Sequence, residues 1–181
     1  MKVDLEKGGI YTFNNFLTDK ECEKYDEIVR NPPQQASAFT QTGGFDNKKW
    51  TDPELSSYFY SLLKNHISDK TINNNEFPNI LRANTLIMTG NYNPGQQFNM
   101  HTDTGLYYNI KEKSRWTLLI YLNDDYEGGH TLFYDDDFKF TKDITPKKGM
   151  ALLFDIDLWH RGDVIITGNK RWIGCEIISS H

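Results

Sequence analysis

Eight short β-rich runs, each separated from the next by a turn signal, follow Pro78 and limit the folds open to this chain. They cover residues 81–88, 97–101, 116–122, 131–134, 138–144, 151–154, 163–166 and 171–178. The turn sequences between them include Asn93-Pro94-Gly95 and Gly128-Gly129. Short strands at this spacing are typical of an antiparallel sandwich or jelly roll. We therefore predict a mainly β fold, a double-stranded β-helix (jelly roll).

Two helices are predicted before this β-rich part, after a short strand over residues 10–13. Thr18, with Glu21 three residues later, fits a capping box. This first helix should end before Asn31-Pro32-Pro33, because a residue that precedes proline avoids the helical region. A second helix is expected over residues 53–67. Its buried stripe should comprise Leu55, Tyr58, Leu62 and Leu63. We expect both helices to pack on one outer sheet face, which leaves the interior free to hold a small ligand.

The chain of 181 residues suits a single domain, with residues 1–77 as helical support and N-terminal strands and residues 78–181 as the jelly-roll core. A net charge of -5 argues against a nucleic-acid or membrane partner. Residues 1–7 lack the apolar run of a signal peptide. Cys22 and Cys175 are too few for a disulfide scaffold, so we expect a cytoplasmic protein with reduced thiols. The oligomeric state is left open.

Three side chains form a candidate metal site. His101 and Asp103 are two residues apart, and in a strand such residues point to the same face, so both can bind one ion. His160 is the best candidate for a third ligand, because it follows one apolar strand and precedes another. Two histidines and one carboxylate on one side of a metal leave positions open for reactants, which is the arrangement of non-haem Fe(II) oxygen chemistry.

A lysine ten residues after His160 suggests an anion site. A dicarboxylate cosubstrate needs a cation at the end that lies away from the metal. Alternation along the last strand puts Lys170, Trp172, Gly174 and Glu176 on one face, and Arg171, Ile173, Cys175 and Ile177 on the other. The second set is expected to pack against the helices, so Lys170 should point inward. Arg171 is the alternative, because arginine binds carboxylates bidentately and a slip of one residue exchanges the faces.

With these residues considered together, the chain resembles the iron(II)/2-oxoglutarate dioxygenases, in particular their prolyl 4-hydroxylase-like branch, over about residues 81–178. The segments that carry the resemblance are Tyr92-Asn93-Pro94-Gly95 with His101-Thr102-Asp103, Arg115 to Asn123, Gly128-Gly129-His130-Thr131-Leu132-Phe133, and His160 with Gly168-Asn169-Lys170. The resemblance implies Fe(II) bound by His101, Asp103 and His160. It also implies 2-oxoglutarate held by Lys170, with Tyr92 and Tyr121 lining its pocket. Dioxygen would be the second cosubstrate, and ascorbate is compatible as a reductant.

The resemblance implies hydroxylation of a protein or peptide side chain, with a prolyl residue as the expected target. One position departs from the family pattern. Prolyl hydroxylases carry a tryptophan six residues after the cosubstrate lysine or arginine, whereas this chain has Glu176. An inward carboxylate there could attract a basic group, or it could pair with Lys170 or a bound water. Together with Trp172 and Tyr107, it is a candidate substrate contact.

Two other functions remain open. The first is hydroxylation of a free amino acid or another small molecule, and the second is a non-catalytic metal- or ligand-binding module on the same jelly roll. Dealkylation of nucleic acid is not expected, because the chain is acidic and lacks the two spaced arginines of that branch after His160. Residues 39–52 and 104–113 are expected to be irregular loops that control access to the pocket.

Overall fold

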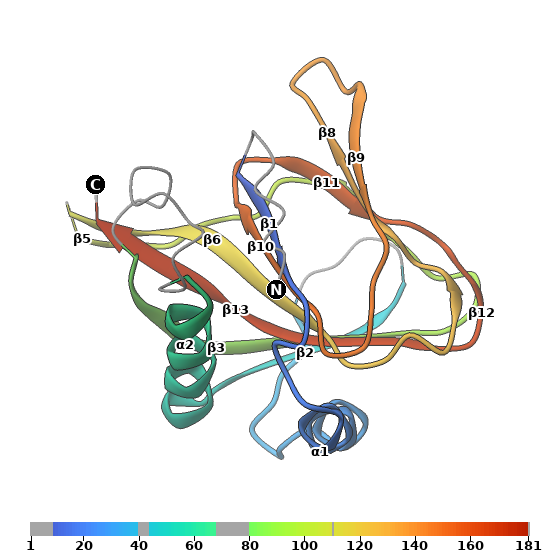
Figure 1. The fold of residues 1–181 in the computed structure, drawn as a ribbon, viewed down its shortest axis with the longest axis horizontal. Coiled ribbons are helices and arrows are strands. Elements are labelled where there is room, and N and C mark those ends of the chain that lie inside the picture. The colour runs from blue at the N-terminus through green and yellow to red at the C-terminus, as the bar shows by residue number, and fades with distance from the viewer. Residues whose placement is uncertain (1–8, 40–43, 68–79, 110, 181) are drawn as a thin grey trace.

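The structure, a computed structural model, describes residues 9–39, 44–67, 80–109 and 111–180. The elements fold into two facing β-sheets with a pair of helices on one side, as Figure 1 shows. The strand pairs within the described residues are all antiparallel. The mainly β class and the jelly-roll layout that the sequence predicts are therefore confirmed.

The larger sheet has seven strands in the order β1-β10-β6-β13-β3-β2, with β5 paired to β6. Its strands are β1 (Ile10–Phe13), β2 (Asp46–Thr51), β3 (Ile80–Tyr92), β5 (Tyr107–Asn109), β6 (Glu112–Tyr121), β10 (Ala151–Asp155) and β13 (Lys170–Ser180). The smaller sheet has the order β4-β11-β8-β9. It comprises β4 (Phe98–His101), β11 (Trp159–Gly162), β8 (Thr131–Tyr134) and β9 (Phe140–Ile144). A separate pair joins β7 (Glu127–Gly128) and β12 (Ile165–Thr167).

Local sequence signals set both helices, α1 (Asp19–Arg30) and α2 (Pro53–Ile67). The Thr18 hydroxyl accepts a hydrogen bond from the Glu21 amide, and the Glu21 carboxylate accepts one from the Thr18 amide at 2.8 Å. This is the predicted capping box. At the start of α2, the Asp52 carboxylate accepts a hydrogen bond from the Leu55 amide at 2.9 Å. Among the described residues, neither helix has the length and apolar character needed to cross a membrane.

Both helices lie on the same face of the larger sheet, as predicted (Figure 1). The apolar layer between the helices and this sheet contains Tyr25 of α1, Phe59 and Leu63 of α2, and Ile87 of β3. The predicted stripe of α2 was partly wrong. Tyr58 is 36% exposed, whereas Phe59 is fully buried, because the face of α2 that meets the sheet is centred on Phe59 and Leu63.

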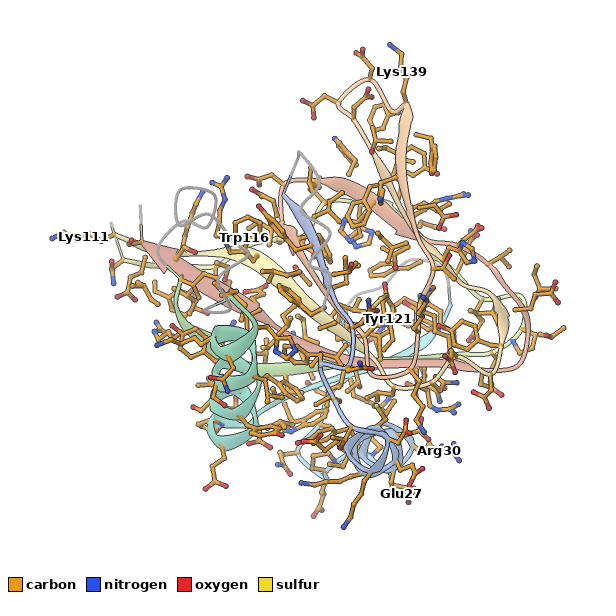
Figure 2. The ribbon with its side chains drawn as sticks, in the orientation of Figure 1. Glu27, Arg30, Lys111, Trp116, Tyr121 and Lys139 are labelled. Carbon is orange, nitrogen blue, oxygen red and sulfur yellow. The ribbon has the colours of Figure 1, made fainter. Side chains whose placement is uncertain are left out.

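Strand β13 lies between two apolar layers because its side chains alternate. Ile173, Cys175 and Ile177 pack toward the helices, and Trp172 packs into a second cluster between the two sheets. Tyr121, labelled in Figure 2, belongs to this inner cluster and is fully buried, whereas Lys139 lies at the tip of the hairpin that joins β8 and β9. The two faces of β13 are thus assigned as the sequence predicts.

Four strands were not predicted: β2, β5, β7 and β11. Two of them, β2 and β5, occupy stretches that were expected to be loops. Their pairing partners, β3 and β6, are long strands whose edges supply the missing hydrogen bonds. Residues 40–43 and 110 of those stretches lie outside the described part of the chain.

Candidate active site

His101, Asp103 and His160 meet on the inner side of the smaller sheet. His101 ends β4 and is the direct pairing partner of His160 in β11. The Asp103 amide donates to the Ile156 carbonyl at 2.9 Å, which fixes the residue just beyond β4. The Asp103 Oδ1 atom lies 3.4 Å from His101 Nε2 and 3.8 Å from His160 Nε2. One ligand atom from each of the three residues lies within 4.8 Å of the other two, so they can hold a single metal ion.

Backbone carbonyls orient both imidazole rings. His101 Nδ1 lies 2.7 Å from the Asn99 carbonyl oxygen, and His160 Nδ1 lies 2.9 Å from that of Leu158. Because a carbonyl can only accept, each Nδ1 carries the proton and each Nε2 keeps a free lone pair. His101 Nε2 is buried and has no hydrogen-bond partner among the described residues. A lone pair that is buried without a partner, beside a carboxylate and a second imidazole, fits a bound divalent metal.

The ionisation states of these side chains also suit a metal. Burial raises the pKa of Asp103, but the neighbouring imidazoles and a hydrogen bond from Thr117 outweigh burial and hold this pKa below its ordinary value. Thr117 Oγ1 donates to Asp103 Oδ2 at 2.5 Å. Burial lowers the pKa of His160, although Asp103 opposes that effect. At neutral pH the site thus presents a carboxylate and a neutral imidazole, the forms that bind metals.

A cavity of about 260 Å³ lies between the sheets, with the three candidate ligands and Lys170 in its walls. Lys170 Nζ donates to the Gly129 carbonyl at 2.6 Å and lies 5.2 Å from the centre of the Tyr121 ring. No acidic side chain in the described part of the chain lies within ion-pair distance of this amine. Burial therefore lowers the pKa of Lys170 to about 7, and Asp163 opposes this only in part. A buried amine without an anionic partner is a site for a carboxylate ligand.

Two tyrosines surround this lysine. Tyr92 lines the cavity and stacks on Phe45 with ring centres 4.0 Å apart. The Tyr121 side chain is not part of the cavity wall. Its hydroxyl lies 2.7 Å from Oγ1 of Thr131, and Thr131 lines the cavity. Burial raises the pKa of both phenols, so both keep their protons and can donate hydrogen bonds at neutral pH.

The family model described as "2OG-Fe(II) oxygenase superfamily" matches residues 87–175. This range includes the three candidate metal ligands and Lys170. The chain belongs to the 2OG-Fe(II) oxygenase superfamily. Fe(II) and 2-oxoglutarate are the cofactor and cosubstrate that this family and the His-Asp-His set imply.

Solved structures with the same fold include several prolyl hydroxylases. A prolyl-4-hydroxylase of Pseudomonas putida is 15% identical, with a TM-score of 0.69 over 97% of this chain and 95% of that one. The viral collagen prolyl hydroxylase of Paramecium Bursaria Chlorella virus-1 is 19% identical, with a TM-score of 0.66 over 96% of this chain and 97% of that one. A prolyl hydroxylase of Trichoplax adhaerens, in complex with a hypoxia inducible factor peptide fragment, is 20% identical, with a TM-score of 0.67 over 94% and 84%. At these identities the likeness establishes the fold of the oxygenase and no more. No curated protein matches the chain in sequence.

Arg171, the alternative to Lys170, does not reach the cavity of this oxygenase. It lies on the helix side of β13, where its guanidinium forms an ion pair with Asp26 of α1. The structure therefore contradicts its expected role as a ligand of 2-oxoglutarate, because the strand register turns it away from the metal site.

The candidate substrate contacts differ in their positions. Trp172 and Glu176 both line the cavity. Glu176 accepts hydrogen bonds from Ser114 at 2.5 Å and Asn84 at 3.3 Å, and Lys170 donates to the Gly129 carbonyl, so the alternative in which Glu176 pairs with Lys170 is wrong. The side chain of Tyr107 lies outside the described part of the structure.

Several polar residues of the site were not predicted. Thr117 holds the metal-site carboxylate, and Ser114 and Asn84 hold Glu176. The sequence did contain a signal for Thr117: it lies four residues before Tyr121 in one strand, so both must face inward. No comparable signal marks Asn84. A register shift next to it in β3 means that the sheet face to which its side chain points cannot be read from alternation alone.

Proposed function

We propose that this oxygenase hydroxylates a side chain of a protein or peptide, and that a prolyl residue is its target. The observation that carries the proposal is the placement of a three-residue metal site and a buried lysine, which has no acidic partner among the described residues, in one cavity. The shared fold with prolyl hydroxylases, one of them bound to a peptide, favours a peptide substrate.

Each residue has a distinct proposed task. His101, Asp103 and His160 would bind Fe(II), and Lys170 would bind the carboxylate of 2-oxoglutarate that lies away from the metal. When bound, Fe(II) and 2-oxoglutarate supply the oxidising chemistry: dioxygen is consumed, 2-oxoglutarate becomes succinate and carbon dioxide, and one oxygen atom enters a C–H bond of the substrate.

The protein's contribution is orientation and exclusion of water. Thr117 holds the Asp103 carboxylate in place, and Lys170 fixes the direction of the cosubstrate through a charge-assisted hydrogen bond. Tyr92 and Tyr121 flank that amine with buried rings, which keeps the interaction dry and strong. Phe154 and Trp172 add apolar surface to the cavity wall.

A screen of peptides and metabolites tests the proposal. The protein is loaded anaerobically with Fe(II) and 2-oxoglutarate, exposed to dioxygen with each candidate, and analysed for a mass gain of one oxygen atom. We expect the gain on a proline-containing peptide, with one succinate formed per oxygen inserted. A gain confined to free amino acids or other small molecules would support the small-molecule hydroxylase instead. Metal binding without any substrate-stimulated succinate would support a non-catalytic module.

A further inference from the structure

Glu176 is a carboxylate in the wall of the catalytic cavity that has no task in the proposed binding of Fe(II) or 2-oxoglutarate. Its residue is 9% exposed, and it lies on the inward face of β13 with Lys170 and Trp172. A buried carboxylate is costly unless it is hydrogen-bonded or paired with a cation. The partners of Glu176 must come from the protein or from a ligand in the cavity.

The two hydrogen bonds to Glu176 engage only one of its carboxylate oxygens. Ser114 and Asn84 both donate to Oε2, at 2.5 and 3.3 Å. In the described part of the chain, no donor or cation lies within bonding distance of Oε1. These two donors fix the side chain, and the second oxygen remains available to a ligand in the cavity.

The position of Glu176 places it near the substrate and away from 2-oxoglutarate, which Lys170 is proposed to bind. The two residues are six positions apart on one strand, which is about 20 Å at about 3.3 Å per residue. Glu176 pairs across the sheet with Thr117, and Thr117 holds the metal ligand Asp103. Glu176 thus lies at the level of the metal site, where a substrate must approach, and well away from the anion site at Lys170.

We propose that Glu176 is a specificity residue that binds a positively charged amino or guanidinium group of the substrate through Oε1. The inference rests on the proposed function, and it adds that the peptide substrate carries a basic residue next to the residue that is oxidised. Burial raises the pKa of Glu176 and so disfavours its charged form. A cation beside Oε1 would stabilise that charged form. The acidic net charge of -5 would favour the approach of such a peptide.

Binding of matched peptides tests this inference without turnover. Four short acetylated peptide amides are compared by calorimetry, two with lysine directly before or after a proline, and two with uncharged norleucine in its place. The full chain is used as purified and again with Fe(II) and 2-oxoglutarate under anaerobic conditions. We expect one lysine peptide to bind at least about tenfold more tightly than its norleucine twin.

Variants locate the effect. Glu176→Gln keeps the shape of the side chain and the hydrogen bonds from Ser114 and Asn84, so it should reduce the preference to less than about twofold. Glu54→Gln makes the same charge change at an exposed position in the first turn of α2, on the helix side of the sheet, and should keep the preference. Equal binding of the twins to the wild type, including no measurable binding of either, would overturn the inference, as would a preference that survives in Glu176→Gln.

The proposed function is judged separately, by the mass gain on proline. Oxidation of lysine and norleucine peptides with equal affinity would leave the proposed function standing and remove the role of Glu176. Charge-selective binding without oxidation of any peptide would remove the proposed function and keep Glu176 as a cation site.

Discussion

At the residue scale, Thr117 contacts the candidate metal site through one hydrogen bond, to the oxygen of Asp103 that does not face the histidines. Partners of this kind typically account for a 10- to 100-fold effect on metal affinity. We expect Thr117→Val, which has nearly the same shape, to weaken Fe(II) binding by about that factor when it is measured by anaerobic titration. Thr117→Ser restores the hydroxyl and should recover most of the affinity. Wild-type affinity in Thr117→Val would show that Asp103 needs no support.

Lys170 should make cosubstrate binding depend on pH. In the free protein its pKa is about 7, and a bound carboxylate would raise that value, so binding takes up a proton. The affinity for 2-oxoglutarate should therefore be highest below about pH 7 and fall by up to about tenfold per pH unit above it. Calorimetry between about pH 6.5 and pH 9 measures this slope.

An arginine at the same position provides the control for this pH effect. Lys170→Arg stays charged over the whole range, so its affinity should be independent of pH above pH 7. Lys170→Ala should weaken 2-oxoglutarate binding by roughly 10- to 100-fold, which corresponds to the loss of one charge-assisted hydrogen bond of about 1.5–3 kcal/mol. A flat profile for the wild type above pH 7 would contradict the assignment of Lys170 as the cosubstrate ligand.

At the element scale, helix α1 begins at a reciprocal pair of hydrogen bonds between Thr18 and Glu21. Thr18→Ala removes one of them and should lower the free energy of unfolding by about 1 kcal/mol, measured by chemical denaturation. Thr18→Ser keeps an equivalent hydroxyl and should have a smaller effect. Because α1 lies on the opposite face of the larger sheet from the cavity, the affinity for 2-oxoglutarate should not change in either variant. A changed affinity would mean that α1 influences the site.

Elements defined by local signals were predictable, and elements defined by pairing were not. The boundaries of α1, α2 and β1 follow from caps, prolines and a short apolar run. Strand β11 is different, because Trp159-His160-Arg161-Gly162 is short and half polar and becomes a strand only between β4 and β8. The sequence could therefore nominate His160 as a metal ligand, but it could not show that His160 would lie directly opposite His101.

The site shows the same division at single residues. Strand alternation predicts that His101 and Asp103 point to one side and that Lys170 points inward, and all three line the cavity. Because β4 ends at His101, however, Asp103 is fixed by its amide hydrogen bond to the Ile156 carbonyl and not by a strand. The direction of Arg171, toward the helices, follows from the same alternation, but its ion pair with Asp26 depends on the packing of α1. The hydrogen bonds of Ser114 and Asn84 to Glu176 depend on register shifts along β13 and could not be read from spacing.

At the scale of the whole molecule, the larger sheet separates a stabilising side from a catalytic side. Phe59 of α2 is fully buried in the layer that joins helices and sheet. We expect Phe59→Ala to lower the free energy of unfolding by about 3–5 kcal/mol, because it leaves a cavity in that layer. This is a large part of the roughly 5–15 kcal/mol that holds a typical domain together. Lys64→Ala, at an exposed position on the same helix, should change the free energy of unfolding by less than about 0.5 kcal/mol. A small effect of Phe59→Ala in thermal or denaturant unfolding would contradict this division.

The central claim is that His101, Asp103 and His160 hold one Fe(II) in the cavity that also binds 2-oxoglutarate at Lys170. Anaerobic equilibrium dialysis with Fe(II) and labelled 2-oxoglutarate measures both ligands together on the wild type and on Asp103→Ala. We predict one iron and one 2-oxoglutarate per wild-type chain, and loss of both from Asp103→Ala at the same free concentrations. Wild-type occupancy of iron and 2-oxoglutarate in Asp103→Ala would contradict the account.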